Sequence, residues 1–345
     1  MIAFSSIDKL VLCFFRNPRS YAKFTPGLFV IYLLLGLQCI YAQSDPLESI
    51  YKLEPVGDRV IDVIIDTDTY NEIDDQFAVV YALLASERMT VKSIYAAPYL
   101  NKRSTSAGDG MQKSYEEILR LLSRLNRSSE GFVFKGSDRF MIENNNQPVE
   151  SEATEHLIDH VRRAEGLTYV ITLGAPTNVA SAIMLAPDIK EKMVVVWLGG
   201  KAHHWSTASE FNLMQDLKAS QILFDSGVPL IQVPTNPVTS HLLTSLPEIE
   251  QYLKGRGEIG QYLYEIYLDY YEDHFARSKV IWDISAVAYL INHEWFNTAL
   301  VPSPILTSEM TYSFDPSRHF IRVVQELRRD SIFGDMFSRI HNFVK

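Results

Sequence analysis

The sequence from Val63 to Ala78 reads VIIDTDTYNEIDDQFA, and this stretch decides the fold. The β-branched apolar residues Val60, Ile61, Val63, Ile64 and Ile65 are typical of a buried parallel strand. Four apolar side chains then recur at helical spacing, namely Phe77, Val80, Tyr81 and Leu84. A helix is therefore predicted to begin near Asp74, directly after the loop that follows the strand.

The loop between this strand and this helix is rich in carboxylates. It carries Asp66, Asp68, Asp74 and Asp75 at the carboxyl end of one strand, where open α/β sheets bind ligands. Four like charges in so small a space repel one another unless protons or a cation neutralise them. Carboxylate oxygens suit a hard cation, Ca²⁺ or Mg²⁺. The alternative is a solvated, acidic helix N-terminus, which the helix dipole tolerates.

Strands and helices continue to alternate after this stretch. Further strands are predicted at residues 91–97, 132–134, 168–173, 193–198 and 229–233, and further helices at 111–125, 153–164, 178–185 and 215–226. This alternation predicts an α/β fold, a mostly parallel open sheet with helices on both faces and a Rossmann-like core. From Leu246 onward the pattern predicts helices. One of them, residues 259–273, is rich in tyrosine, and we expect most of these rings to pack internally.

Composition excludes several classes of function. The formal charge of −10 is spread along all 345 residues without a basic block, which argues against nucleic-acid binding. Residues 1–43 resemble a secretory signal peptide, with basic residues before an uncharged run at 24–42; an uncleaved membrane anchor is the alternative. Cys13 and Cys39, the two cysteines of the chain, lie in this leader. We therefore expect a secreted or periplasmic protein without thiol chemistry, cleaved between Ala42 and Asp45.

The acidic stretch resembles the N-terminal signature of the nucleoside hydrolases, the calcium-dependent inosine-uridine-preferring N-ribohydrolases. That signature is Asp-x-Asp-Pro-Gly-x-Asp-Asp, whereas this chain has a longer turn without Pro-Gly between Asp68 and Asp74. The segments LGAPTN (173–178), WLGG (197–200), EFN (210–212) and IWDISA (281–286) resemble further motifs of the family, in the same order. The resemblance covers about residues 60–290. It implies one catalytic domain at residues 44–345, and we expect a homo-oligomer.

The resemblance also implies a metal site and a ribose site. Ca²⁺ would be held by Asp68, Asp75, Asp283 and the main-chain carbonyl of Leu173, with Asp68 as general base. The ribose would be held by Asp74, Asn101, Glu210 and Asn212. On its own residues, the segment at 177–178 predicts a helix cap by Thr177 or Asn178.

One position departs from the family pattern in a way that affects the chemistry. Trp282 stands where many members have a histidine that protonates the leaving base. An indole cannot transfer a proton near neutral pH, but it can stack on a base. The acid would then come from His203, His204 or a tyrosine of residues 259–273, or be absent.

These observations predict a calcium-dependent enzyme that hydrolyses ribonucleosides to ribose and free base. Two alternatives remain open. Asp66 with Asp68 and Thr69 also fits the nucleophile loop of haloacid-dehalogenase-type phosphohydrolases, in which Asp66 attacks phosphorus. The chain could instead be a calcium-stabilised nucleoside or sugar receptor without catalysis.

Overall fold

The computed structural model describes residues 46–343. The predicted leader, both cysteines and the predicted cleavage region lie outside these residues. The chain divides into two compact units, residues 1–48 and 49–345. The described part of the first unit is residues 46–48, the start of α3 (Pro46–Lys52). Among residues 46–343, no helix is both long and apolar enough to cross a membrane.

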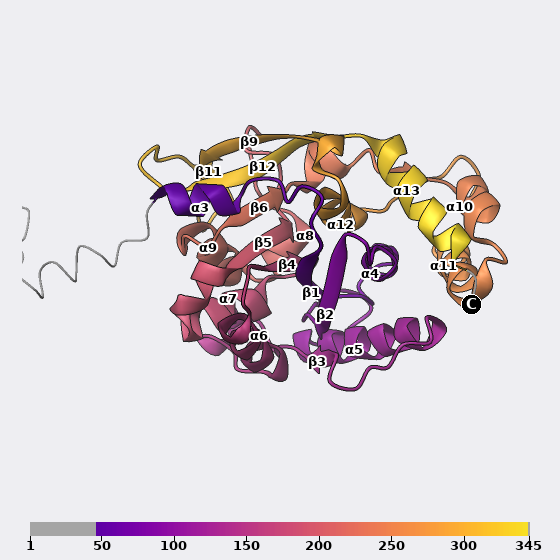
Figure 1. The fold of residues 1–345 in the computed structure, drawn as a ribbon, viewed down its shortest axis with the longest axis horizontal. Coiled ribbons are helices and arrows are strands. Elements are labelled where there is room, and N and C mark those ends of the chain that lie inside the picture. Colours follow the sequence, from indigo (N-terminus) through magenta and orange to yellow (C-terminus); the bar gives the residue numbers. More distant parts are fainter. Residues whose placement is uncertain (1–45, 344–345) are drawn as a thin grey trace, which may run out of the picture. The chain divides into compact units, whose positions relative to one another are not determined.

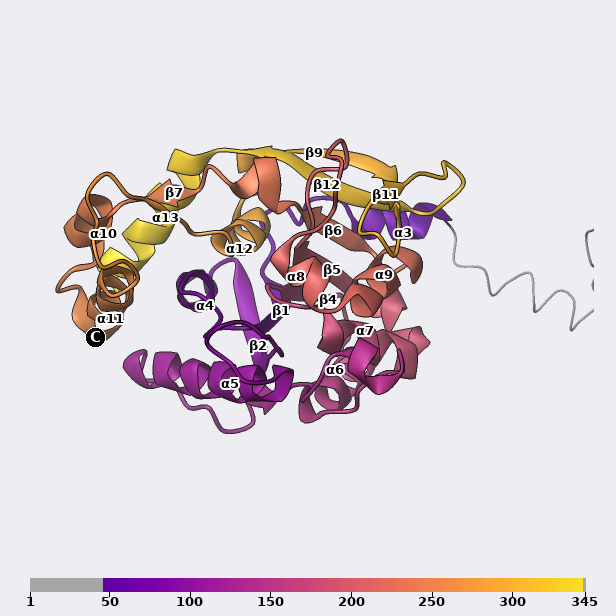
Figure 2. The ribbon, with the colours of Figure 1, turned by 180° about the vertical axis from the view of Figure 1, so that it is seen from behind.

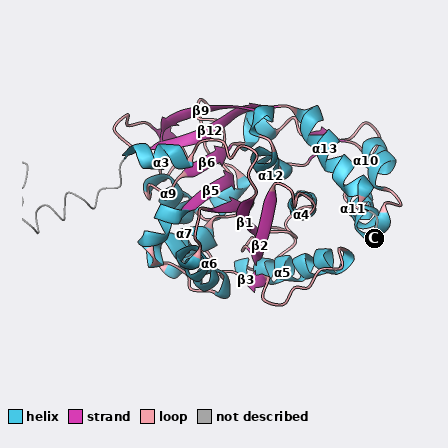
Figure 3. Cartoon of the chain, viewed as in Figure 1, coloured by secondary structure: helices cyan, strands magenta, loops and turns pink. Residues whose placement is uncertain are grey.

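The second unit is built on an eight-stranded sheet with the strand order β3-β2-β1-β4-β5-β6-β12-β9. Its strands are β1 (Ile61–Thr67), β2 (Met89–Ala96), β3 (Val133–Lys135), β4 (Thr168–Thr172), β5 (Met193–Leu198), β6 (Leu230–Val233), β9 (Phe296–Pro302) and β12 (Phe320–Leu327). All neighbours pair in parallel except β12 and β9, which are antiparallel. Figure 3 shows these strands between the helices. The predicted α/β fold with a mostly parallel sheet is confirmed.

Helices cover both faces of this sheet. They are α4 (Asp74–Leu83), α5 (Ala107–Arg124), α6 (Glu152–Arg163), α7 (Thr177–Leu185), α8 (Phe211–Gln215), α9 (Leu217–Asp225), α10 (Leu246–Leu253), α11 (Gly257–Leu268), α12 (Ile284–Ile291) and α13 (Arg329–Asn342). In Figures 1 and 2, α6, α7 and α9 lie on one side of the sheet and α4, α12 and α13 on the other. Short helical turns follow β3, α7, β6 and α12, namely η2 (Met141–Asn144), η3 (Pro187–Lys192), η4 (Thr235–Thr239) and η5 (His293–Trp295).

The alternation of side chains along β1 produces two cores. Val63 and Ile65 point into the core beneath α4, α5, α12 and α13, while Ile64 points into the core beneath α6, α7 and α9. Successive residues of a strand face opposite sides of a sheet, so a strand covered on both faces must be apolar throughout. This explains why β1 is apolar up to Asp66 except at the half-buried Asp62.

The prediction of an all-helical C-terminal part was wrong. The chain returns to the sheet after α12, where β9 and β12 form an antiparallel edge with Ile321 paired to Val301. Two small sheets, β10–β11 (Ile305–Leu306, Tyr312–Ser313) and β7–β8 (Leu243–Thr244, Lys279–Val280), also occur among the described residues. Most residues of the edge strand β9 are partly exposed. Its mixed composition therefore lacks the apolar run that marks the buried parallel strands.

Candidate active site

The acidic stretch lies at the carboxyl edge of the sheet, as the sequence predicts. Asp66 is in β1 and pairs in register with Thr172 of β4 and Tyr95 of β2. Asp68 follows the strand, and Asp74 and Asp75 are the first two residues of α4. All four carboxylates are buried, at most 3% exposed. They are therefore not a solvated helix N-terminus.

Asp283 joins this cluster from a distant part of the chain. It precedes α12, which packs against α4, and it is 4% exposed. One carboxylate oxygen from each of Asp74, Asp75 and Asp283 lies within 4.8 Å of the others. Such a group of buried carboxylate oxygens has the ligand chemistry that a hard divalent cation requires. The trio includes Asp74, for which the resemblance implied a ribose contact, and does not include Asp68.

The carboxylates of the cluster are poorly satisfied by the rest of the protein. Among the described residues, neither oxygen of Asp68 has a hydrogen-bond partner, and neither does Oδ1 of Asp283. Asp75 is better placed, because Thr67 Oγ1 donates to its Oδ1 at 2.5 Å. Buried polar atoms are normally paired, so unpaired carboxylate oxygens indicate a missing positive partner. The residues present thus fit a bound metal ion.

Burial and mutual repulsion shift these groups in the same direction. Burial, followed by the charge of Asp74, raises the pKa of Asp75 to about 8. Burial and the charges of Asp75 and Asp74 raise the pKa values of Asp68 and Asp283 well above the usual carboxylate range. A divalent cation would reverse these shifts, since an opposite charge at contact favours the ionised form.

The absence of a side chain at Gly174 leaves room for the Asp68 carboxylate. A Cβ atom at position 174 would lie 2.9 Å from Asp68 Cγ, so a larger residue there would displace the carboxylate. This glycine follows Leu173 at the end of β4, the strand next to β1. The motif that looked like a simple turn in the sequence therefore shapes the acid cluster.

Asn212 connects the predicted metal and ribose regions. Its side-chain Nδ2 donates to Leu173 O at 2.6 Å and to Leu198 O at 3.0 Å, which ties the ends of β4 and β5 together. The Leu173 carbonyl that we expected to contact the metal thus already accepts one hydrogen bond. A carbonyl oxygen has a second lone pair that remains able to bind a cation.

Glu210 is a helix cap in the structure. Its carboxylate accepts hydrogen bonds from the backbone N–H groups of Asn212, Leu213 and Gly200 at 3.0, 3.2 and 2.8 Å, and it begins α8. A carboxylate has about four acceptor sites, so one remains for a substrate hydroxyl. Asn101 is also engaged locally, since its Nδ2 donates to Asn71 Oδ1 at 2.6 Å and its Oδ1 accepts from the N–H of Arg103.

Trp282 contacts the acid cluster with its main chain. Its backbone N–H donates to Asp74 Oδ2 at 3.1 Å, and its half-buried side chain packs against the larger core. His203 is engaged elsewhere, with Nε2 2.8 Å from Gln232 Oε1 and its ring against Tyr312. Burial lowers the pKa of His203. His204 is exposed, and among the described residues no hydrogen bond links it to the acids.

Most tyrosines of the predicted aromatic helix pack internally, as expected: Tyr267 lies in the larger core, and Tyr262, Tyr264 and Tyr270 pack against it. Tyr262 donates to Glu117, and Tyr267 donates to Thr244 O at 2.7 Å. Tyr270, which follows α11, differs because Lys279 Nζ lies 5.4 Å from its ring centre and Lys279 also contacts Asp74. It is the tyrosine of this run that the described contacts connect to the acid cluster.

Two residues near the acids were not predicted as functional. Lys279, 5% exposed, is a buried cation against Asp74. Asn178 was expected to cap α7, but the N-cap is Pro176, without a side-chain hydrogen bond. Asn178 instead reaches Asp66, with Nδ2 2.7 Å from Oδ1. Burial raises the pKa of Asp66 to about 7 although this hydrogen bond opposes the shift.

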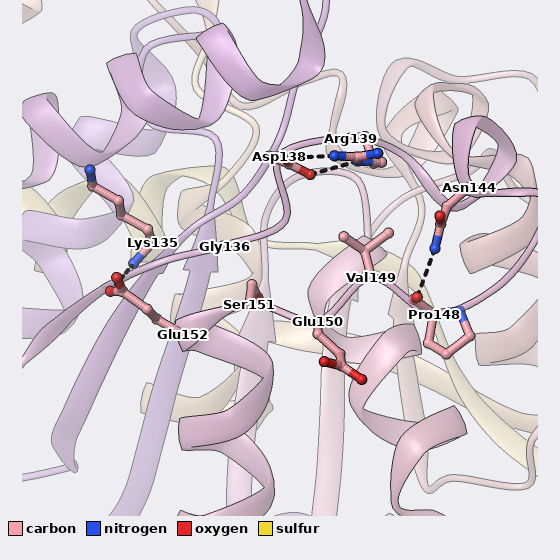
Figure 4. Close-up of a pocket in the computed structure, with 10 residues that line it drawn as sticks. All are labelled: Lys135, Gly136, Asp138, Arg139, Asn144, Pro148, Val149, Glu150, Ser151 and Glu152. Carbon is pink, nitrogen blue, oxygen red and sulfur yellow. Dashed lines mark hydrogen bonds and ion pairs between the residues drawn. The ribbon is translucent and has the colours of Figure 1, made fainter.

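A separate hollow of about 510 Å³ lies between the end of β3 and the start of α6 (Figure 4). Lys135, Arg139 and Glu152 line it, and each forms a contact with a neighbouring residue. No residue lining this hollow leaves a buried polar atom unpaired. The unpaired carboxylates, rather than this hollow, therefore mark the candidate active site.

The chain is similar to known nucleoside hydrolases. Residues 63–333 match the family described as inosine-uridine preferring nucleoside hydrolase. A probable uridine nucleosidase 2 of Arabidopsis thaliana is 26% identical over 245 residues, 65% of this chain and 74% of the relative. A pyrimidine-specific ribonucleoside hydrolase RihA of Escherichia coli is 26% identical over 266 residues, 68% of this chain and 81% of the relative.

Solved structures agree on the fold. A plant nucleoside hydrolase superposes with a TM-score of 0.66 at 18% identity, covering 82% of this chain and 99% of the other. A purine-preferring ribonucleoside hydrolase from Gardnerella vaginalis gives 0.64 at 21% identity, covering 81% and 98%. The family match includes the acidic stretch, Asp283 and every strand between them. The chain therefore belongs to the inosine-uridine preferring nucleoside hydrolase family and is a hydrolase that acts on N-glycosyl bonds.

Proposed function

We propose that the chain is a Ca²⁺-dependent nucleosidase that hydrolyses the N-glycosidic bond of ribonucleosides to ribose and free base. The observation that carries this proposal is the set of buried, unpaired carboxylate oxygens on Asp68 and Asp283 beside Asp75. An all-oxygen donor set favours Ca²⁺ or Mg²⁺ over softer metals. Membership of the nucleoside hydrolase family supports a nucleoside as the substrate.

The residues at the carboxyl edge of the sheet have separable tasks in this proposal. Asp75, Asp283 and the carbonyl oxygen of Leu173 would hold the cation together with Asp68. The cation, when bound, would supply a Lewis acid that lowers the pKa of water. Asp74 would accept hydrogen bonds from ribose hydroxyls. Asn212 and Glu210 already fix the ends of β4 and β5, and each keeps acceptor capacity for the sugar.

Asp68 is the residue that we assign to the proton transfer. As general base it takes a proton from the water that attacks the anomeric carbon of the ribose. The carbon–nitrogen bond breaks as the new carbon–oxygen bond forms, and the bonding electrons leave with the base. Positive charge develops on the sugar during this step, and the surrounding carboxylates stabilise it because they are fixed before the reaction begins.

The departing base needs a proton or must leave as an anion. Trp282 cannot supply this proton, and His203 is bound to Gln232. Trp282 would instead hold the base by stacking, while Tyr270 beside Lys279 is the phenol of residues 259–273 that the described contacts connect to the acids. A base that leaves easily as an anion would therefore be favoured.

Two alternatives fit the site less well. In a phosphohydrolase Asp66 would be the nucleophile, but Asp66 is fully buried within β1 and accepts a hydrogen bond from Asn178. The family match also favours an N-glycosyl hydrolase. A non-catalytic nucleoside receptor would bind the same ligand without turnover, so an activity assay separates it from the enzyme.

A panel of purine and pyrimidine ribonucleosides tests the proposal. Purified protein should release free ribose from at least one of them, lose this activity with a chelator and regain it with Ca²⁺. Activity that depends on Mg²⁺ with phosphorylation of Asp66 would overturn the proposal. Tight nucleoside binding without ribose release would favour the receptor.

A further inference from the structure

Lys279 is a buried lysine with three polar contacts. It lies in β8 and is 5% exposed. Its Nζ is 2.6 Å from Glu72 Oε2, 3.5 Å from Asp74 Oδ1 and 2.8 Å from the carbonyl oxygen of Val280. A buried ammonium group is tolerated only when it is paired in this way. Its position is therefore set by Glu72 and Asp74.

The segment that carries Lys279 holds the Asp74 carboxylate at both oxygens. Lys279 approaches Oδ1, while the backbone N–H of Trp282 donates to Oδ2 at 3.1 Å. A carboxylate contacted at both oxygens from one segment has a fixed orientation. Asp283 follows in the same segment, so one segment both orients Asp74 and supplies the last acid of the cluster.

Lys279 also fastens the longer loop between Asp68 and Asp74. Glu72, its second partner, lies in this loop and accepts a hydrogen bond from Arg103 at its carbonyl oxygen, 3.0 Å away. Asn101 Nδ2 binds Asn71 of the same loop at 2.6 Å. The loop is thus attached to the segment after β2 on one side and to Lys279 on the other.

The charge of Lys279 acts on the same site. Burial pushes the pKa of this amine down, but Asp74 and Glu72 more than offset that effect, so the pKa is raised and the group stays cationic. The fixed positive charge of Lys279 beside the acid trio weakens the attraction of the trio for a divalent metal cation. It also attracts Asp74 and Glu72 to the positions they occupy.

We propose that Lys279 is a positioning residue of the active site, which orients Asp74 and the loop at Glu72 for ribose binding and reduces the affinity of the site for the divalent cation. This role rests on the proposed nucleosidase function. This role predicts opposite effects on nucleoside binding and on cation binding, whereas the loss of a purely structural lysine would impair both. Loss of the lysine should weaken nucleoside binding and tighten cation binding.

The test compares three variants of the full chain with the wild type. Lys279→Met removes the charge and keeps the length of the side chain. Glu72→Gln removes the acidic partner at a side chain that is 41% exposed and leaves the lysine in place. Lys254→Met is the matched control, because Lys254 forms an exposed ion pair with Glu250 away from the acids. Calorimetric titration with Ca²⁺ alone and steady-state kinetics with a ribonucleoside are measured on each.

The deciding result is that the Ca²⁺ affinity changes in opposite directions in Lys279→Met and Glu72→Gln. Lys279→Met should bind Ca²⁺ about tenfold more tightly, while Glu72→Gln, which removes a negative charge, should bind it more weakly. Both should raise the nucleoside KM with a smaller change in kcat, and Lys254→Met should match the wild type. Weaker or unchanged Ca²⁺ binding in Lys279→Met, or an unchanged KM, would overturn the role of Lys279.

Three further outcomes remain decisive. If Lys279→Met does not fold, Glu72→Gln must still raise KM and weaken Ca²⁺ binding, and its failure to do so overturns the proposal. If the wild type binds neither Ca²⁺ nor nucleoside, the proposed function is wrong and the positioning role falls with it. If the wild type is active but the variants keep its Ca²⁺ affinity and KM, only the positioning role is contradicted.

Discussion

Asn212 donates its side-chain N–H to the carbonyl oxygen of Leu173 at 2.6 Å, and this hydrogen bond joins the strand ends that flank the acid cluster. The same nitrogen binds Leu198 O at 3.0 Å. Asn212 is 6% exposed, so these carbonyls have little access to water if the amide is removed. The residue predicted to contact ribose therefore also holds the scaffold of the site.

Asn212→Ala should lower both stability and activity. Leaving buried carbonyl groups unsatisfied costs about 1–3 kcal/mol, which urea unfolding can measure. Asn144→Ala is the matched control. Asn144 Nδ2 also donates to carbonyl oxygens, at 2.9 Å for Pro148 and 3.4 Å for Gln147, and neither of these bonds reaches the acids. Equal losses of activity in the two variants would contradict the role of Asn212 in the site.

Gly174→Ala should damage catalysis more than folding. The added methyl group would lie 2.9 Å from Asp68 Cγ and push the proposed general base aside. A displacement of about 1 Å can cost roughly 100-fold in rate, so kcat should fall by that order. Gly166→Ala, where no heavy atom lies within 4 Å of the added carbon, is the control. A fully active Gly174→Ala would show that Asp68 does not need this position.

The stability of the metal-free protein should fall as pH rises from 7 to 8. The folded-state pKa of Asp75 is raised from 3.8 to about 8, and those of Asp68 and Asp283 are raised well above 3.8. The folded chain therefore holds protons that the unfolded chain has already released. Each such proton lowers the free energy of unfolding by about 1.4 kcal/mol per pH unit across this window. His203, whose lowered pKa acts in the opposite direction, matters only near or below its ordinary value of 6.5.

Thermal unfolding with a chelator and with Ca²⁺ measures this effect. The melting temperature with chelator should drop by roughly 2–4 °C for each kcal/mol lost between pH 7 and pH 8. Bound Ca²⁺ should abolish the drop, because it replaces the protons. Asp75→Asn should make the drop with chelator smaller, because it removes one of the protonated acids. A melting temperature that rises over this window with chelator would contradict the assignment of these buried acids.

Trp282 and Asp283 should respond very differently to substitution. Trp282→Phe keeps an aromatic face and should retain most activity, whereas Trp282→Ala should lose roughly 1–3 kcal/mol of transition-state stabilisation, the scale of base–aromatic stacking. Asp283→Ala removes a proposed metal ligand and should fail far more severely. The comparison uses kcat/KM, which reports the loss relative to free enzyme and substrate. Equal, mild effects at both positions would mean that neither reaches the site.

The fold and the position of the acids could be predicted because their causes are local. The apolar run of β1 ends at Asp66, and an acidic loop after a buried parallel strand must lie at the carboxyl edge of the sheet. The antiparallel edge of β9 and β12 was missed because partly exposed strands lack such a run. The motif containing Asp283 was found by resemblance, and its approach to Asp74 comes from the packing of α12 on α4.

The contacts around the acids could not be predicted because they join distant segments. Lys279 has no local signal, and its pairing with Glu72 and Asp74 exists only after β8 returns to the first loop. Glu210 was expected by resemblance to bind ribose; its capping of α8 is local, but its third hydrogen bond comes from the N–H of Gly200, which follows β5. Asn178 lies in α7, after β4, and donates to Asp66 of the neighbouring strand β1 rather than capping its own helix.

The most direct test of the central claim measures Ca²⁺ binding and ribose release on the same samples. The double variant Asp75→Asn/Asp283→Asn should lose both, because the two carboxylates belong to the buried trio. The control Asp159→Asn/Asp188→Asn alters two acids of surface ion pairs and should retain both. The wild type should bind one Ca²⁺ per chain and release ribose only when it is bound. Ribose release with chelator, or undiminished Ca²⁺ binding by the first variant, would contradict the assignment of this site.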